Sequence, residues 1–160
     1  MANKALIISG FQGIGKSTYA RTHLKCVDLE SSNFDKTNKN WYKDYCKTAL
    51  DLMSQGYTVF VSSHKVVRDY LLRETPYYIM VAPTLEQKEM FINRVKARYH
   101  EDPNPKNYRA YKAAEFDYDS YIVEIKNDKY LPVYWLREDE PFLTDDVIRN
   151  IKIEIERRIA

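Results

Sequence analysis

The fold of this chain is decided by one stretch near its N-terminus, Gly10-Phe11-Gln12-Gly13-Ile14-Gly15-Lys16-Ser17. It matches the pattern G-x-x-x-x-G-K-[ST], in which backbone N–H groups and a lysine surround phosphate oxygens. Gly10 and Gly15 allow backbone turns that a Cβ atom would forbid. We expect Lys16 to place its charge on the β- and γ-phosphates and Ser17 to ligate the accompanying Mg²⁺. The stretch therefore predicts a nucleoside-triphosphate site.

The sequence on either side has the form that this motif requires. The apolar run Lys4-Ala5-Leu6-Ile7-Ile8-Ser9 predicts a strand, and Ser17-Thr18-Tyr19-Ala20-Arg21 predicts the start of a helix. Three of the chain's four glycines fall in the stretch, which argues against an ordinary strand–helix turn with an incidental lysine. We expect ATP and Mg²⁺ as ligands. The residues expected to contact ATP here are Gly10, Gly13, Ile14, Gly15, Lys16, Ser17 and Thr18.

The composition indicates one globular domain, residues 1–160, with 44% apolar and 30% charged residues. A formal net charge of +2 is too small to indicate a nucleic-acid partner. Cys26 and Cys46 have no metal-binding or redox spacing, so they predict reduced thiols in a cytoplasmic protein. No apolar run approaches the length of a membrane span, and we expect no membrane partner.

Short apolar runs alternate with amphipathic segments along the chain. The predicted strands are residues 4–9, 26–30, 57–61, 77–82 and 131–136. The predicted helices are residues 17–21, 41–55, 64–74, 84–99 and 108–127, and one that Thr144 caps. Two prolines predict a mobile loop at 100–107. This alternation predicts an α/β fold whose parallel sheet carries helices on both faces, with its ligands at the carboxyl edge.

Three features together resemble the small P-loop kinases, above all the nucleoside monophosphate kinases, with shikimate- and gluconate-kinase-like enzymes alongside. They are the glycine-rich stretch, the turn Asp28-Leu29-Glu30-Ser31-Ser32, and the Arg94/Arg98 pair. The resemblance implies a P-loop NTPase fold with a five-stranded sheet in the order 2-3-1-4-5. It also implies an acceptor-binding region at about 28–45 and a small lid at about 94–112. The implied activity is ATP-dependent transfer of the γ-phosphoryl group to a nucleoside or deoxynucleoside monophosphate.

The third predicted strand departs from this family because Val61-Ser62-Ser63-His64 contains no acid, where many such kinases keep an aspartate. Asp28 is the best substitute. It can hold a magnesium-bound water or accept the proton of the acceptor hydroxyl. Glu30 is a poorer candidate for the same work. The alternative is that Asp28 only caps the next segment.

The family places its second substrate beside the segment after the second strand. Phe34 lies in a polar loop, which favours stacking on a base, whereas Tyr42 lies on an apolar stripe that equally favours core burial. Arg68 resembles the family's acceptor-phosphate arginine, although a solvated helix arginine explains it as well. The predicted acceptor-binding residues are Asp28, Glu30, Ser31, Ser32, Phe34 and Arg68.

The lid prediction depends on Arg94 and Arg98, which are i, i+4 neighbours on a predicted helix. In the family such arginines close over the phosphates, so Arg94 is also expected to contact ATP. The alternative is that both pair with surface acids such as Glu86, Glu89 or Glu101. The predicted catalytic residues are Lys16, Asp28, Arg94 and Arg98.

Other functions stay open at this stage. The acceptor can instead be a polynucleotide 5′ end or a non-nucleotide metabolite, and the chain can be a regulatory nucleotide-binding protein with little turnover. The missing acid favours this last alternative, and the two arginines oppose it. Half of the fourteen tyrosines lie between Tyr99 and Tyr134. Acids interleave with them, which favours a half-buried helix over a nucleic-acid surface.

Overall fold

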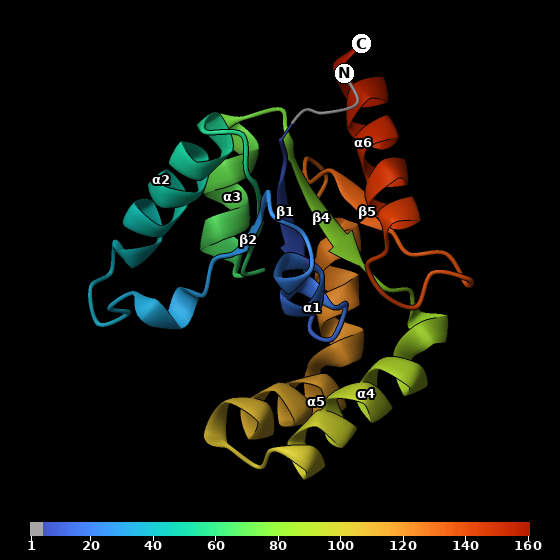
Figure 1. Cartoon of the computed structure of the whole chain (residues 1–160). Helices are drawn as coiled ribbons and strands as arrows, with labels where there is room; N and C mark the ends of the chain where they lie inside the picture. The colour runs from blue at the N-terminus through green and yellow to red at the C-terminus, as the bar shows by residue number, and fades with distance from the viewer. Residues whose placement is uncertain (1–4) are drawn as a thin grey trace.

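A five-stranded parallel sheet forms the centre of the molecule (Figure 1). The computed structural model describes residues 5–160, so Lys4 of the predicted first strand lies outside the described residues. The strands are β1 (Ile7–Gly10), β2 (Cys26–Asp28), β3 (Thr58–Val61), β4 (Tyr78–Ala82) and β5 (Val133–Trp135). They are ordered β2-β3-β1-β4-β5 and all neighbours are parallel, which confirms the predicted α/β fold and strand order.

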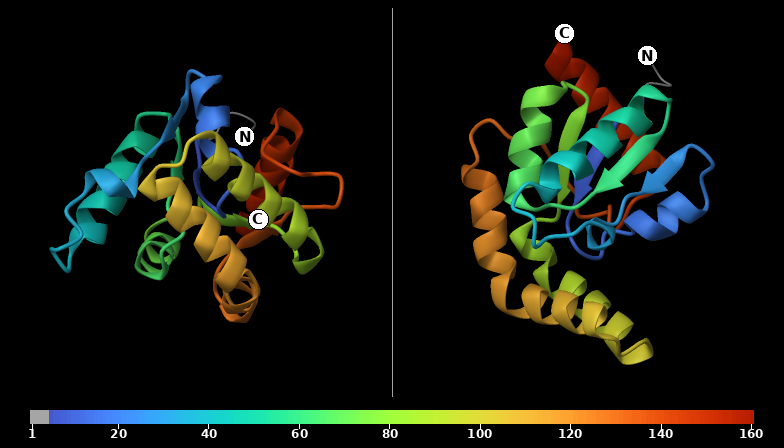
Figure 2. Two further views of the ribbon diagram at one scale, coloured as in Figure 1. Left: turned by 90° about the horizontal axis from the view of Figure 1, so that it is seen from below. Right: turned by 90° about the vertical axis from the view of Figure 1, so that its left-hand side faces the viewer.

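Helices cover both faces of this sheet (Figure 2). They are α1 (Lys16–Arg21), α2 (Trp41–Ser54), α3 (Lys65–Glu74), α4 (Lys88–Glu101), α5 (Pro105–Asn127) and α6 (Asp145–Ile159). α1 and α6 lie on one face, whereas α2, α3 and the second half of α5 lie on the other. None of the helices in residues 5–160 is long and apolar enough to cross a membrane.

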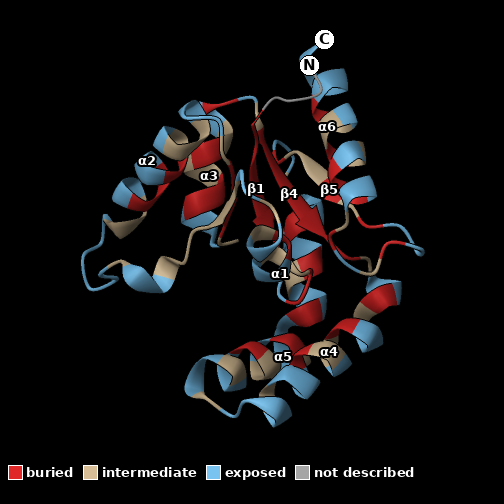
Figure 3. Ribbon diagram, in the orientation of Figure 1, coloured by how far each residue is buried: buried red, intermediate tan, exposed pale blue. Residues whose placement is uncertain are grey.

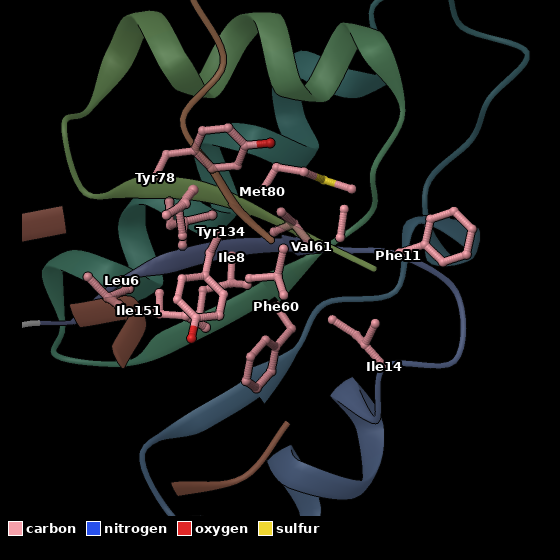
Figure 4. Packing of buried hydrophobic residues seen from close by; sticks show 14 of the residues in the cluster. Leu6, Ile8, Phe11, Ile14, Phe60, Val61, Tyr78, Met80, Tyr134 and Ile151 are labelled. Atoms are coloured by element: carbon pink, nitrogen blue, oxygen red, sulfur yellow. The ribbon is translucent and has the colours of Figure 1, made fainter. Parts of the chain in front are cut away.

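The core lies on both sides of the sheet because both faces are covered (Figure 3). Phe60 and Ile151 of α6 pack on one side, while Tyr78 and Met80 point toward α3 on the other (Figure 4). β1, β3 and β4 are buried along their whole length. Each strand is shorter than predicted, since residues at the ends of the apolar runs leave the hydrogen-bonded ladder.

The predicted loop at 100–107 is wrong. α4 continues to Glu101 and α5 begins at Pro105, which leaves three residues between the helices. Pro105 occupies the first position of α5, where its missing N–H costs nothing. The Asn104 side chain caps the helix by accepting a hydrogen bond from the Asn107 N–H at 2.8 Å. The residues that predicted a loop therefore begin a helix.

α4 and the first half of α5 form a helical hairpin that projects from the sheet (Figures 1 and 2). α5 then changes direction, and its second half returns along the sheet. Phe11 joins the two parts, since its ring centroid lies 6.2 Å from that of Phe91 of α4 and 5.1 Å and 5.4 Å from those of Tyr118 and Tyr121 of α5. The glycine-rich stretch is thus packed directly against the hairpin helices.

Tyr45 ties the ends of two neighbouring strands together from α2. Its ring is fully buried, and its hydroxyl donates to the Leu29 carbonyl oxygen at 2.5 Å. The same hydroxyl accepts a hydrogen bond from the Ser62 N–H at 2.8 Å. Leu29 follows β2 and Ser62 follows β3, so this one side chain fixes the spacing of the two segments that leave these strands.

Tyr45→Phe should lower the free energy of unfolding by about 1–3 kcal/mol, because it leaves a partly buried carbonyl and a partly buried N–H without their partner. Tyr42→Phe is the matched control, since Tyr42 is only half-buried on the same helix and packs edge-on against Tyr70. Urea titration followed by circular dichroism measures both variants. Equal losses in the two would contradict this role for the Tyr45 hydroxyl.

Candidate functional site

A cavity of about 380 Å³ lies at the carboxyl edge of the sheet, where β1, β2 and β3 end. Its walls come from the glycine-rich loop (residues 10–17), the segments that follow β2 and β3, and the hairpin helices. The lining residues are Gly10, Gln12, Gly13, Ile14, Gly15, Lys16, Ser17, Asp28, Leu29, Glu30, Ser31, Val61, Ser62, Ser63, His64, Arg98, Lys106 and Tyr121. This edge is where ligands of parallel sheets bind.

The glycine-rich loop requires its glycines. Gly13 and Gly15 have φ angles of 83° and 90°, in the left-handed region that disfavours other residues. A Cβ atom on Gly10 would lie 2.4 Å from Ile14 Cδ1 and 2.7 Å from Lys16 Cδ. The loop therefore turns tightly enough to bring the Lys16 side chain back over Gly10.

The carbonyl groups of the loop are held from outside the cavity. Arg94 Nη1 donates to the carbonyl oxygens of Gly13 at 2.6 Å and of Pro141 at 2.7 Å. The Leu143 N–H donates to the Ile14 carbonyl oxygen at 2.8 Å. Within residues 5–160, the N–H groups of residues 15–17 have no hydrogen-bond acceptor. The loop thus keeps free donors at the wall of the cavity.

Lys16 carries a positive charge into the cavity without an ion pair in the described part of the chain. Its Nζ donates to the Gly10 carbonyl oxygen at 2.9 Å. Burial lowers the pKa of Lys16, while the charges of Asp28 and Glu30 oppose that shift. An anion bound at this position would supply the partner that the ammonium group lacks.

Asp28 and Glu30 form a carboxyl pair on the opposite wall. Burial raises the pKa of Asp28, and the nearby charge of Glu30 raises it further, while the charge of Lys16 opposes the shift. Glu30 also forms an ion pair with Lys106 of α5 at 3.1 Å. This contact connects the segment after β2 to the helical hairpin, and no local sequence pattern indicates it.

Arg68 is not in the cavity. Its side chain is 1% exposed, and Nη2 donates to Glu124 Oε1 at 2.9 Å. Its Nη1 donates to the Ser63 carbonyl oxygen at 2.9 Å. The guanidinium is thus neither a surface group nor available to an acceptor phosphate. The sequence could not indicate this, because Glu124 lies 56 residues away on α5.

Two other predicted acceptor contacts also lie outside the cavity wall. The half-buried Phe34 ring packs edge-on against Tyr45, with ring centroids 5.1 Å apart. Ser32 is exposed and does not line the cavity, whereas Ser31, Asp28 and Glu30 do. The structure therefore brings together the first part of the predicted acceptor region and not the rest.

Arg94 and Arg98 have different surroundings, and neither pairs with a surface acid among residues 5–160. Arg94 binds the two carbonyl groups described above. Arg98 is exposed and lines the main cavity. Both arginines also line a second cavity of about 480 Å³ that adjoins the first at Gly13 and Gly15. Its other walls are Thr18, Tyr19, Thr22, His23, Phe142, Leu143, Thr144 and Asp145.

Sequence reasoning missed several residues of the main cavity. Ser62, Ser63 and His64 follow directly from β3, at the carboxyl edge where the sequence predicts the ligands, although none of the three was predicted as a site residue. His64 Nδ1 lies 2.9 Å from Ser62 Oγ, and burial lowers the pKa of its imidazole. Tyr121 reaches the cavity because α5 bends back along the sheet, whereas Lys106 reaches it from the first turn of α5 in the hairpin. No sequence signal marks that bend.

Comparison with known proteins adds no relative: no protein-family model matches the chain, and no curated protein matches it significantly. In the described residues, no group of three or more His, Cys, Asp or Glu side chains is placed to hold a metal ion. The function is therefore inferred from the residues of the cavity.

Asp28→Asn should raise Tm at pH 7 by about 1–3 °C. A carboxyl whose pKa is raised by folding destabilises the native state above that pKa, and the amide removes this penalty. The difference should shrink as the pH falls toward 4, where the acid is neutral in both states. Thermal unfolding at both pH values measures it.

Asp35→Asn is the control with the opposite sign. Hydrogen bonds from the Thr37 hydroxyl and N–H lower the pKa of Asp35, so its charged form stabilises the fold. Its replacement should lower Tm at pH 7. A lower Tm for Asp28→Asn as well would mean that the charge of Asp28 stabilises the native state.

Proposed function

We propose that this protein is an ATP-dependent phosphotransferase that moves the γ-phosphoryl group of ATP to a small acceptor. The glycine-rich loop carries this proposal. In one cavity wall it combines left-handed glycines with backbone N–H groups that have no acceptor, and a lysine that has no ion pair, among residues 5–160. Such donors surround phosphate oxygens in P-loops, so the combination supports a phosphate-binding role for this loop.

The residues present fit ATP and Mg²⁺. The phosphates would lie along the glycine-rich loop, and the second cavity, which shares Gly13 and Gly15 with the first, offers room for the nucleoside. Mg²⁺ in such sites takes one or two protein oxygens and its other ligands from phosphates and water, and it neutralises charge on the transferred group. Ser17 and, through water, Asp28 would hold it.

Side chains at the edges of the cavity would neutralise charge, accept the proton and exclude water during the transfer. Lys16 and Arg98 supply positive charge where the phosphoryl group is transferred. Asp28 would accept the proton of the acceptor hydroxyl, and its raised pKa makes it a better base near neutral pH. The hairpin that carries Arg94 and Arg98 would act as the lid that excludes water.

Lys16→Ala should abolish acceptor-dependent ADP release and weaken ATP binding by about tenfold or more, because the ammonium serves the ligand. Its circular dichroism spectrum should stay that of the wild type. Lys129→Ala, at a position after α5 and away from both cavities, is the control and should leave activity unchanged. Near-normal turnover in the Lys16 variant would refute the phosphotransferase. ATP binding without any ADP release in the wild type would favour a regulatory nucleotide-binding protein.

The two lid arginines should give different results. Arg98→Ala should cut turnover by roughly several hundredfold with little change in ATP affinity, since Arg98 contacts the cavity and holds no other group. Arg94→Ala should weaken ATP binding as well, because the carbonyls of Gly13 and Pro141 lose their donor. Steady-state kinetics and calorimetry measure the two quantities. Small, equal losses from Arg98→Ala would place it on an ordinary solvated face.

A further inference from the structure

We infer that the acceptor is an uncharged polyhydroxyl compound, a nucleoside or a sugar-like polyol, whose hydroxyl groups bind to Asp28 and Glu30. The inference depends on the proposed phosphotransferase and names its second substrate. It disfavours the nucleoside monophosphate that the sequence predicts, because the acceptor end of the cavity is built for hydroxyl groups and not for a second phosphate.

The carboxyl pair is the first observation. Asp28 and Glu30 are two residues apart in the segment that ends and follows β2, and both line the cavity. Carboxylates bind hydroxyl groups through short, strong hydrogen bonds. A phosphate monoester would bring about two further negative charges next to this pair, and like charges in a partly buried site repel strongly. The pair therefore favours a neutral acceptor.

The positive groups are the second observation. In residues 5–160, the cations that line the cavity are Lys16, Arg98 and Lys106. Lys16 belongs to the glycine-rich loop, and Arg98 lines both cavities, so these two lie at the donor end. Lys106 is paired with Glu30 at 3.1 Å. None of the three is left for an acceptor phosphate.

Two nearby cations are engaged elsewhere. Arg68, which the family resemblance suggested for this task, is buried against Glu124 and the Ser63 carbonyl oxygen. The Lys36 ammonium lies over the Trp41 ring, 5.1 Å from its centroid, and does not line the cavity. A phosphate-binding subsite would need one of these side chains to leave its present partner.

The rest of this wall is polar and uncharged. Ser31, Ser62, Ser63, His64 and Tyr121 contribute hydroxyl, carbonyl and imidazole groups. Burial lowers the pKa of His64, which keeps its imidazole neutral at pH 7. The Tyr121 hydroxyl donates to the Ser63 carbonyl oxygen at 2.9 Å, so its position is fixed. Neutral donors and acceptors beside two carboxyl groups match the several hydroxyls of a sugar ring or polyol.

The test measures ADP release from Mg²⁺ and ATP with matched pairs of acceptors. One arm pairs thymidine, deoxyadenosine, cytidine and guanosine with their 5′-monophosphates, and the other pairs glucose, ribose, mannitol and glycerol with their phosphate esters. A neutral compound should give the highest kcat/KM, and its ester about 100-fold less. The arm that contains it identifies a nucleoside or a polyol. A phosphorylated compound as the best acceptor, or no stimulation by any neutral one, would overturn the inference.

Glu30→Gln provides the second readout. It should raise KM for the best neutral acceptor by about tenfold, while ATP affinity stays within about twofold. Glu101→Gln, at the exposed end of α4, is the matched control and should change neither. An unchanged KM in Glu30→Gln would remove Glu30 from the acceptor site.

ATP titration of the same samples separates the two proposals. If ATP binds and Lys16→Ala weakens that binding by about tenfold or more, failure of the neutral acceptors overturns only the acceptor class. If ATP does not bind the wild-type protein, the proposed function fails and the acceptor class fails with it.

Discussion

The clamp on the glycine-rich loop is the interaction on which the site depends. Arg94 of α4 binds the carbonyl of Gly13 and that of Pro141, and the Leu143 N–H binds the carbonyl of Ile14. The N–H groups of residues 15–17 lie at the start of α1, where helix N–H groups lack an intrahelical partner, and they have no acceptor within residues 5–160. The clamp also joins the hairpin and the segment before α6 to the loop. A movement of either would therefore change the loop.

The cavity holds its charges apart. Within residues 5–160 Lys16 has no ion pair, and Asp28 and Glu30 line the same cavity. Burying charged groups without complete pairing lowers the stability of the fold. Proteins retain such groups at sites where a ligand interacts with the charges. The Glu30–Lys106 ion pair connects the segment after β2 to the hairpin. A movement of the hairpin would therefore change the surroundings of Glu30 at the acceptor end of the cavity.

The fold could be predicted from local sequence patterns, whereas the arrangement of the site depends on contacts between residues that are far apart in the sequence. The glycine-rich loop, the five strands and the cap at Thr144 each depend on neighbouring residues, and the structure contains all of them. Pro105 was misjudged because a proline that ends one helix also suits the start of another. Arg68 was misplaced because its partner, Glu124, lies on a distant helix. Such pairings depend on how α5 bends, which no short pattern encodes.

The central claim is that the glycine-rich loop binds the β- and γ-phosphates of ATP. Calorimetric titration of the wild-type protein with ATP, ADP and AMP in the presence of Mg²⁺ tests it most directly. If the loop provides the main contacts, ATP and ADP should bind about 100-fold more tightly than AMP, which lacks the phosphates that reach Lys16. AMP binding as tightly as ATP would contradict the claim, since the nucleoside would then supply the affinity.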